Sequence, residues 1–208
     1  MARDAAGNTS GSNSATIDTV PPAVPTIQPS RGLVLTGTAE AGSTVVLTGS
    51  NGAPIGTTTA AANGTWSFTP SSPLPHNTAV TVVARDAAGN QSPSAGTTID
   101  SQAPTAPSNL FVSADGTLLT GTAEANTQVR IVVNGNVAHP ITVTATAAGT
   151  FAAVLIPALV AGQAIAVSAT DAAGNVSASA GTNAPNLSAP IISVAEALDT
   201  YILSLIHI

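Results

Sequence analysis

One five-residue block, Asp-Ala-Ala-Gly-Asn, occurs three times in this chain, at residues 4–8, 86–90 and 171–175. The copies begin 82 and 85 residues apart, and other short blocks recur between them in the same order. Thr-Ile-Asp ends at Asp18 and again at Asp100, and Leu-Thr-Gly-Thr-Ala-Glu-Ala begins at Leu35 and again at Leu119. A fixed period indicates a tandem array of one structural unit, here about 84 residues long.

Short segments between these landmarks alternate apolar and more polar residues, which predicts β-strands. The clearest examples are residues 79–85 and their counterpart in the second unit, 164–170. Their apolar positions are Val80, Val82, Ala84, Ile165, Val167 and Ala169. Asn51-Gly52 and Asn134-Gly135 favour tight hairpin turns, because both central positions of such a turn need positive φ. No window of about twelve residues has a helical period.

About seven strands per unit, with turns every 8–12 residues, predict an all-β fold of tandem immunoglobulin-like β-sandwich domains. Trp66 and Phe151 stand at equivalent positions, and we expect them to fill the cores between the sheets. Proline-containing segments at residues 20–25 and 103–107 are expected to be short, stiff linkers that join consecutive domains end to end.

The repeat pattern also predicts the domain limits. Residues 1–19 are expected to be the C-terminal remnant of a preceding repeat, 20–101 and 102–185 two complete repeats, and 186–202 the start of a truncated further domain. The last six residues, 203–208, resemble a translated sequencing-adapter end and are interpreted as non-native. The chain is therefore expected to be a fragment of a longer protein.

The composition excludes several functions. Only 7% of residues are charged, and four basic residues with a net charge of −6 cannot form a nucleic-acid-binding patch. There is no cysteine, and the longest apolar run, residues 151–161, contains Pro157 and is too short for membrane insertion. His76 and His139 do not recur between units, so no catalytic arrangement repeats. We predict that the chain is not an enzyme.

Seven of the ten acidic residues occupy repeat-equivalent positions. In a sandwich whose strands run alternately up and down, the loops that carry these acids lie at one end, together with the incoming linker. Three carboxylates in one place, in a chain without lysine, need a counter-charge, and Ca²⁺ is a hard cation that binds six to eight oxygens. The sequence thus predicts structural interdomain calcium sites. Their expected ligands are Asp18, Glu40, Asp86 and Asn90 at one junction, and Asp100, Glu124, Asp171 and Asn175 at the next.

A simpler interpretation of the same residues stays open. Asp-Ala-Ala-Gly-Asn is also a good turn sequence, in which Asp caps the loop and Gly and Asn accept left-handed φ. On this interpretation Glu40 and Glu124 are solvated loop tips, and no metal is bound.

At these motifs the sequence resembles the bacterial Ig-like repeats of giant surface adhesins exported by type I secretion. The resemblance covers residues 1–181 and rests on the DAAGN block, Thr-Ile-Asp, the proline linker and the Thr-Gly-Thr-Ala-Glu-Ala turn. It implies an extracellular location on a bacterial cell surface. It also implies a structural extender, or stalk, that calcium stiffens at domain junctions and that supports adhesion and biofilm formation.

The resemblance further implies two kinds of partner: neighbouring repeats of the same chain, and a host or biofilm surface reached through distal domains. The sequence departs from the pattern after the third block, where Asn183 stands near the expected aspartate, so the third junction is not assigned a metal. The alternative function is an Ig-like module that binds glycans or host surface proteins directly. Few aromatic residues are left for such a site: Phe68, Phe111 and Tyr201.

Overall fold

The structure is a computed structural model that describes residues 2–11 and 17–186. It divides into two compact units. Unit 1 holds the residues up to 103 together with Asp171–Val176, and unit 2 holds Pro104–Thr170 together with the residues from Ser177 onward. The third DAAGN block therefore belongs to unit 1, although segments of unit 2 precede and follow it in the sequence. Apart from Asn186, the predicted segments 186–202 and 203–208 lie outside the described residues.

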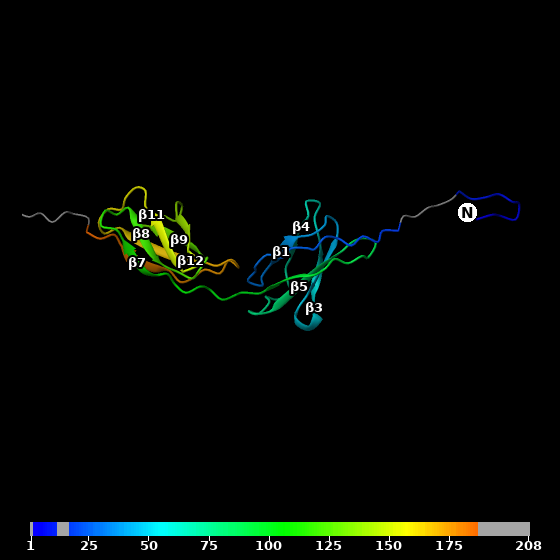
Figure 1. Cartoon of the computed structure of the whole chain (residues 1–208), viewed down its shortest axis with the longest axis horizontal. Coiled ribbons are helices and arrows are strands. Elements are labelled where there is room, and N and C mark those ends of the chain that lie inside the picture. The colour runs from blue at the N-terminus through cyan, green and yellow to red at the C-terminus, as the bar shows by residue number, and fades with distance from the viewer. Residues whose placement is uncertain (1, 12–16, 187–208) are drawn as a thin grey trace, which may run out of the picture. The chain divides into compact units, whose positions relative to one another are not determined.

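Unit 1 is built from two antiparallel sheets (Figure 1). Its strands are β1 (Leu35–Thr38), β2 (Thr44–Thr48), β3 (Pro54–Thr59), β4 (Thr65–Phe68), β5 (Ala79–Arg85) and β6 (Ala95–Thr98). One sheet has the order β3-β2-β5-β6, and in the other β1 pairs with β4. The preceding segment extends the small sheet, because the main-chain nitrogens of Thr26 and Gln28 donate hydrogen bonds to the carbonyls of Thr38 and Thr36.

Unit 2 repeats this plan. Its strands are β7 (Ser108–Val112), β8 (Leu118–Thr122), β9 (Gln128–Val133), β10 (Ile141–Thr144), β11 (Thr150–Val154), β12 (Ala164–Thr170) and β13 (Ala180–Asn183). They form sheets of order β11-β8-β7 and β10-β9-β12-β13. The predicted all-β class is confirmed, and the described part of unit 2 has the seven strands that the sequence pattern indicates.

Each core lies between the two sheets of its unit and consists of the inward-facing residues of alternating strands. In unit 1, Leu35 and Trp66 of the small sheet join Leu47 and Val82 of the large one in a single cluster. In unit 2, Phe151 and Leu119 of one sheet join Ile131 and Val167 of the other. The six apolar positions predicted for residues 79–85 and 164–170 are all buried, so the period of two identified the core face correctly.

The two Asn-Gly pairs adopt the predicted backbone conformation. Asn51 and Gly52 have φ of 59° and 74°, and Asn134 and Gly135 have φ of 48° and 71°. The first pair lies in the loop between β2 and β3, within a single 3-10 turn, Ser50–Gly52. The second follows β9 directly, and the main-chain nitrogen of Asn136 closes its turn on the carbonyl of Val133 at 2.9 Å.

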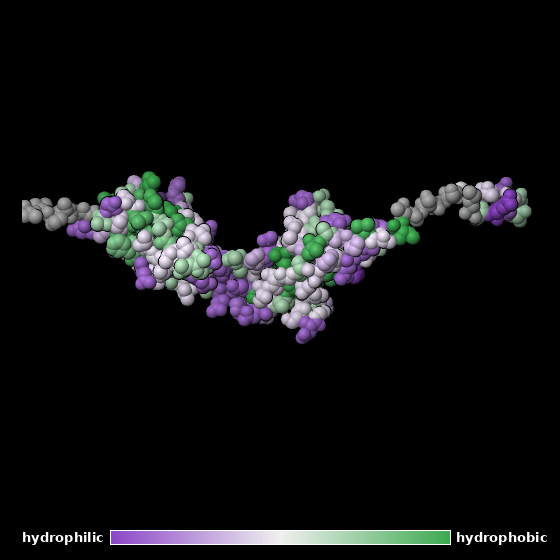
Figure 2. Space-filling model, in the orientation of Figure 1, coloured by the Kyte–Doolittle hydropathy of each residue, from purple (hydrophilic) through white to green (hydrophobic). Residues whose placement is uncertain are grey.

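In the view of Figure 2, the surface of the described residues mixes polar and apolar groups in small patches. Nowhere in the described ranges is there a helix with the length and apolar character needed to cross a membrane.

Candidate functional site

Each DAAGN block folds into a loop that its own aspartate closes. In the second copy, which follows β5, the main-chain nitrogen of Asn90 donates to Asp86 Oδ1 at 2.8 Å, and Asn90 Nδ2 donates to Asp86 Oδ2 at 2.8 Å. The third copy, after β12, has the same two bonds between Asn175 and Asp171, at 2.9 and 2.8 Å. The first copy has them as well, from Asn8 to Asp4.

The glycine of the block, rather than the asparagine, supplies the left-handed backbone. Gly7, Gly89 and Gly174 have φ of 88°, 92° and 86°. A residue with a Cβ rarely adopts this conformation, so glycine is favoured at this position of the loop. The turn therefore does not depend on a left-handed backbone at the asparagine, whose role lies in the hydrogen bonds of its side chain.

In the first two copies, the hydrogen bonds within the loop favour the ionised form of its aspartate. The side-chain hydrogen bond from Asn90 is the largest cause that lowers the pKa of Asp86 below its ordinary value, and the bond from Asn8 does the same for Asp4. A lowered pKa means that the bonds stabilise the charged carboxylate. Any stability that they add is therefore present at neutral pH and is lost as the pH falls through the pKa of the folded state.

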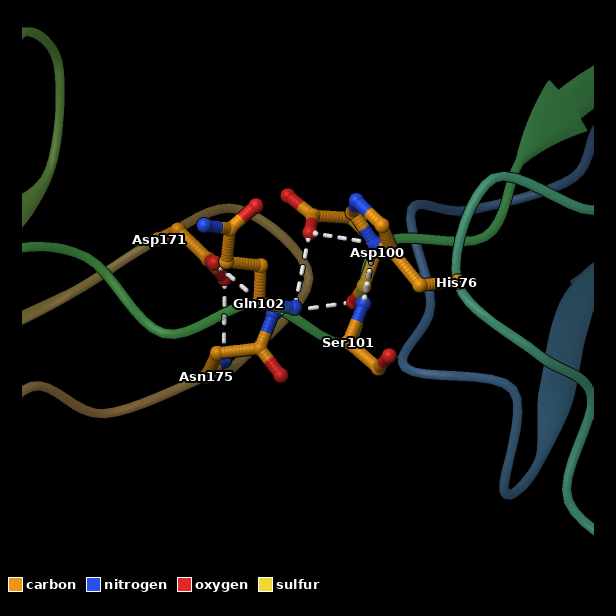
Figure 3. Close-up of polar contacts among 6 residues, drawn as sticks. All are labelled: His76, Asp100, Ser101, Gln102, Asp171 and Asn175. Carbon is orange, nitrogen blue, oxygen red and sulfur yellow. Dashed lines mark hydrogen bonds and ion pairs between the residues drawn. The ribbon is translucent and has the colours of Figure 1, made fainter.

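The same asparagine also binds the linker. Asn175 Nδ2 donates a second hydrogen bond, of 2.8 Å, to the carbonyl oxygen of Asp100, and Figure 3 shows it beside both aspartates. Asn90 Nδ2 donates the equivalent bond, of 3.1 Å, to the carbonyl oxygen of Asp18. The Thr-Ile-Asp block and the DAAGN block, which lie 72 and 75 residues apart at these two contacts, therefore meet in space.

The linker aspartate caps the turn that begins the linker. Asp100 Oδ1 accepts a 3.0 Å bond from the main-chain nitrogen of Gln102 (Figure 3), and Asp18 Oδ1 accepts one of the same length from Val20. The main-chain nitrogen of Asp100 donates to the carbonyl of Ser30, which ties the linker to the body of unit 1. A recurring aspartate followed by a turn is thus one part of a repeated arrangement of loop and linker.

His76 adds a contact that occurs at the second linker. Its Nδ1 accepts a 3.2 Å hydrogen bond from the main-chain nitrogen of Ser101 and lies 3.4 Å from Asp100 Oδ1 (Figure 3). His76 therefore positions the linker chain, which gives it a structural role.

The two glutamates predicted as ligands have a different role in their loops. Glu40 lies between β1 and β2, where its carbonyl accepts bonds from the nitrogen and the Oγ of Ser43, the latter at 2.7 Å. Glu124, in unit 2, serves Thr127 in the same way between β8 and β9. Both glutamate side chains are exposed, as the alternative interpretation expects of loop tips.

The carboxylate and carbonyl oxygens at the repeated arrangement are of the kind that a hard cation binds, whereas each asparagine presents its amide N–H groups there. The contacts contain fewer of the expected ligands than the sequence predicts. They join Asp86, Asn90 and Asp18 but do not include the carboxylate of Glu40. Across residues 2–11 and 17–186, no three residues of the types His, Cys, Asp and Glu are grouped so that they could hold a metal. The convergence of three carboxylates is therefore not part of this structure, and calcium binding stays a prediction.

The sequence reasoning missed a serine six positions after each aspartate. Ser92 is 4% exposed, and its Oγ accepts a 2.9 Å bond from the nitrogen of Ala84 and donates to the carbonyl of Pro93. Ser177 makes the equivalent two bonds, and Ser10 accepts a bond from Ala2 in the first copy. The signal was visible in the sequence, because Asp-Ala-Ala-Gly-Asn-X-Ser occurs in all three copies.

Replacement of Ser92 by alanine should lower the free energy of unfolding of unit 1 by about 1–3 kcal/mol, because the buried N–H of Ala84 loses its acceptor. Urea denaturation followed by the fluorescence of Trp66 measures this. Ser94→Ala is the matched control, since Ser94 is exposed and should change the midpoint little. Equal effects of the two substitutions would contradict the assigned role.

The register of β12 and β13 corrects the position of the third linker. Asn183 pairs with Ala164 as Thr98 pairs with Ala79, so Asn183 corresponds to Thr98 and not to Asp100. Two residues further on, the counterpart of Asp100 is Pro185. Proline has no N–H to repeat the bond that Asp100 donates to Ser30. The chain after unit 2 therefore begins differently from the first two linkers.

Asp115 belongs to unit 2 and lies outside the repeated arrangement. Hydrogen bonds from Ser113 Oγ, which is the largest cause, and from Thr117 lower its pKa from 3.8 to about 2. Because the pKa is lower in the folded state, the bonds stabilise unit 2 above pH 3.8 and are lost as the pH falls towards 2. In an NMR titration the carboxyl of Asp115 should protonate near pH 2, and amide exchange in the core of unit 2 should speed up over this window. Asp115→Asn should remove that part of the pH dependence, and an unchanged profile would contradict it.

Two segments of the chain, residues 21–100 and 103–186, match the family of bacterial Ig domains. They cover most of the sequence, and the chain belongs to this family. The prediction of bacterial Ig-like repeats is confirmed. No curated protein matches the sequence.

Solved structures that this chain matches include the BSP domain of a biofilm associated protein, at 18% identity over 80% of this chain and 30% of that one, with a TM-score of 0.36. A second, described as giving insight into host cell surface retention of a 1.5-MDa bacterial ice-binding adhesin, has 22% identity over 81% and 66%, with a TM-score of 0.31. A third is a Ca²⁺-stabilized adhesin that helps an Antarctic bacterium bind ice, with 26% identity over 88% and 54% and a TM-score of 0.29. The chain spans only part of the length of each.

Proposed function

We propose that this chain is an extender segment of a bacterial cell-surface adhesin, located outside the cell, in which successive Ig-like units are coupled through the loop and linker described above. One observation carries the proposal: Asn90 and Asn175, at repeat-equivalent positions, each bond an aspartate of their own loop and the carbonyl of a Thr-Ile-Asp block. An arrangement that recurs in this way is suited to building an array, whereas a catalytic or ligand site need occur only once.

The partners in this proposal are the neighbouring repeats of the same chain, and distal domains of the parent protein would contact the host or biofilm surface. The repeated groups are Asp, Asn and Ser residues engaged with their own backbone, so the proposed role is structural and not enzymatic. Neither nucleic acid nor insertion into a membrane is part of it.

Calcium is a second, separable part of the proposal. Asp18, Glu40, Asp86 and Asn90 would hold one ion, and Asp100, Glu124, Asp171 and Asn175 another, with oxygen ligands of the kind that calcium prefers. The ion would neutralise the carboxylates and add stability to linkers that are already hydrogen-bonded. Hydrogen bonds support the proposal, because they already bring together three of the four expected ligands at each linker. These are Asp18, Asp86 and Asn90 at the first linker, and Asp100, Asp171 and Asn175 at the second.

Two measurements on the whole chain test these parts separately. A glycan array should give no signal, and saturable binding to a glycan would favour the ligand-binding alternative over the extender. Isothermal titration with Ca²⁺ should give a binding heat, and EDTA should lower the melting temperature. The absence of both effects would remove calcium from the proposal and leave the extender role intact.

A further inference from the structure

The amide nitrogen of Asn175 lies between two oxygens that belong to different segments. It is 2.8 Å from Asp171 Oδ2 in its own loop and 2.8 Å from the carbonyl oxygen of Asp100 in the linker (Figure 3). A primary amide has two N–H donors, and both are used here. Asn90 repeats this arrangement with Asp86 and Asp18 at 2.8 and 3.1 Å.

Two oxygens that face one position need a positive group between them. A carboxylate and a carbonyl both carry negative partial charge, and they repel unless a donor or a cation separates them. At this position the amide nitrogen supplies that group. Among the uncharged side chains, only asparagine and glutamine offer two donors on one nitrogen, and serine offers one.

At the second linker the bridging asparagine is buried, which raises the free-energy cost of losing its hydrogen bonds. Asn175 is 6% exposed, although it lies in a loop and is polar. A buried polar group costs free energy unless its hydrogen bonds are made, so the linker carbonyl and the amide depend on each other. Asn8 makes the same bond to Asp4 in the first copy but is exposed, so it provides an internal comparison.

We propose that the amides of Asn90 and Asn175 occupy the place of a cation and latch the linker to the loop without metal. A cation that bound the same carboxylate and carbonyl oxygens would have to displace the amide N–H groups. An aspartate in place of the asparagine would offer no donor and would add a negative charge. Such a variant would hold the linker only when a cation is present. This inference deepens the proposed function, because it names what couples the linker to the loop.

The test uses the whole chain and hydrogen exchange measured by NMR at two linker amides. Ser101 N–H donates to His76, and Gln102 N–H donates to Asp100, so their protection reports whether the linker is held in place. In the wild-type chain, both amides should already be protected in EDTA, and CaCl₂ should not lower that protection. In Asn175→Ala, it should fall at least about tenfold under both conditions, since a tenfold change matches the loss of one hydrogen bond.

Asn175→Asp should lose protection at these amides in EDTA and regain it in CaCl₂. Asn8→Asp carries the same chemical change at the exposed copy and should leave Ser101 and Gln102 unaffected. Core amides of unit 2, such as those of Ile131 and Val167, should stay protected in every variant and show that the variants are folded. Three outcomes would overturn the latch. The wild type could require calcium for protection at these amides, protection could survive Asn175→Ala, or calcium could fail to restore protection in Asn175→Asp. None of these outcomes bears on the glycan test of the extender role.

Discussion

Replacement of Trp66 by alanine is expected to lower the free energy of unfolding of unit 1 by about 3–5 kcal/mol, the cost typical of removing a large aromatic residue from a core. Trp66 is 3% exposed, and it packs in the same cluster as Leu47 and Val82 of the facing sheet. The substitution leaves a cavity that the paired strands β1 and β4 cannot close. Because the variant lacks the only tryptophan, urea denaturation is followed by circular dichroism.

Trp66→Phe is the informative comparison, because phenylalanine stands at the equivalent position 151 in unit 2. The indole Nε1 of Trp66 is buried, and no acceptor is found for it among the described residues. Removal of that unpaired N–H offsets part of the lost packing, so we expect a loss below about 1.5 kcal/mol. If Trp66→Phe destabilised unit 1 as much as Trp66→Ala, the assignment of this residue to core packing alone would be wrong.

Gly37→Ala should destabilise unit 1 by about 3 kcal/mol, which is the upper part of the usual range for overpacking. Gly37 pairs with Trp66 across β1 and β4. A Cβ on it would lie 2.7 Å from Trp66 Cζ2 and would collide with the main-chain oxygen of Thr26. The indole ring can shift only a little in a packed core, and the main chain of Thr26 is fixed by its bond to β1. The fluorescence of Trp66 during urea denaturation measures the loss.

Substitutions at two further glycines serve as comparisons for Gly37→Ala. Gly121 is the equivalent residue of unit 2, and a Cβ there would lie 2.6 Å from Phe151 Cζ and 2.9 Å from a methyl group of Leu110. These neighbours are side chains, so Gly121→Ala should cost less, about 1–2 kcal/mol. Gly181→Ala should be close to neutral, because its Cβ would meet only the carbonyl of Ile165 at 3.6 Å. A different rank order would show that the aromatic ring does not require glycine opposite it.

The parts of the fold that depend on local pattern could be predicted from the sequence. Val80, Val82 and Ala84 alternate on one strand, and the structure buries all three. The aromatic core positions and the two Asn-Gly turns follow from equally local rules. The meeting of the DAAGN and Thr-Ile-Asp blocks was also predictable, because a sandwich of alternating strands gathers those segments at one end.

Side-chain directions in the loops could not be predicted in this way. Topology places Glu40 at the same end of the sandwich, but its turn is closed by Ser43 through the main chain, which leaves the glutamate side chain exposed. The count of acidic residues drew attention to carboxylates. The structure assigns the bridging role to the neutral amides of Asn90 and Asn175, which a charge count does not register.

The most direct test of the account is the tumbling of the two units in solution, measured by ¹⁵N relaxation of the whole chain in EDTA. If Asn175 couples loop and linker as proposed, residues in β5 and in β12 should report the same long rotational correlation time. Asn175→Ala should then separate the two values and shorten both. Independent, short correlation times for the two units in the wild-type chain would contradict the account.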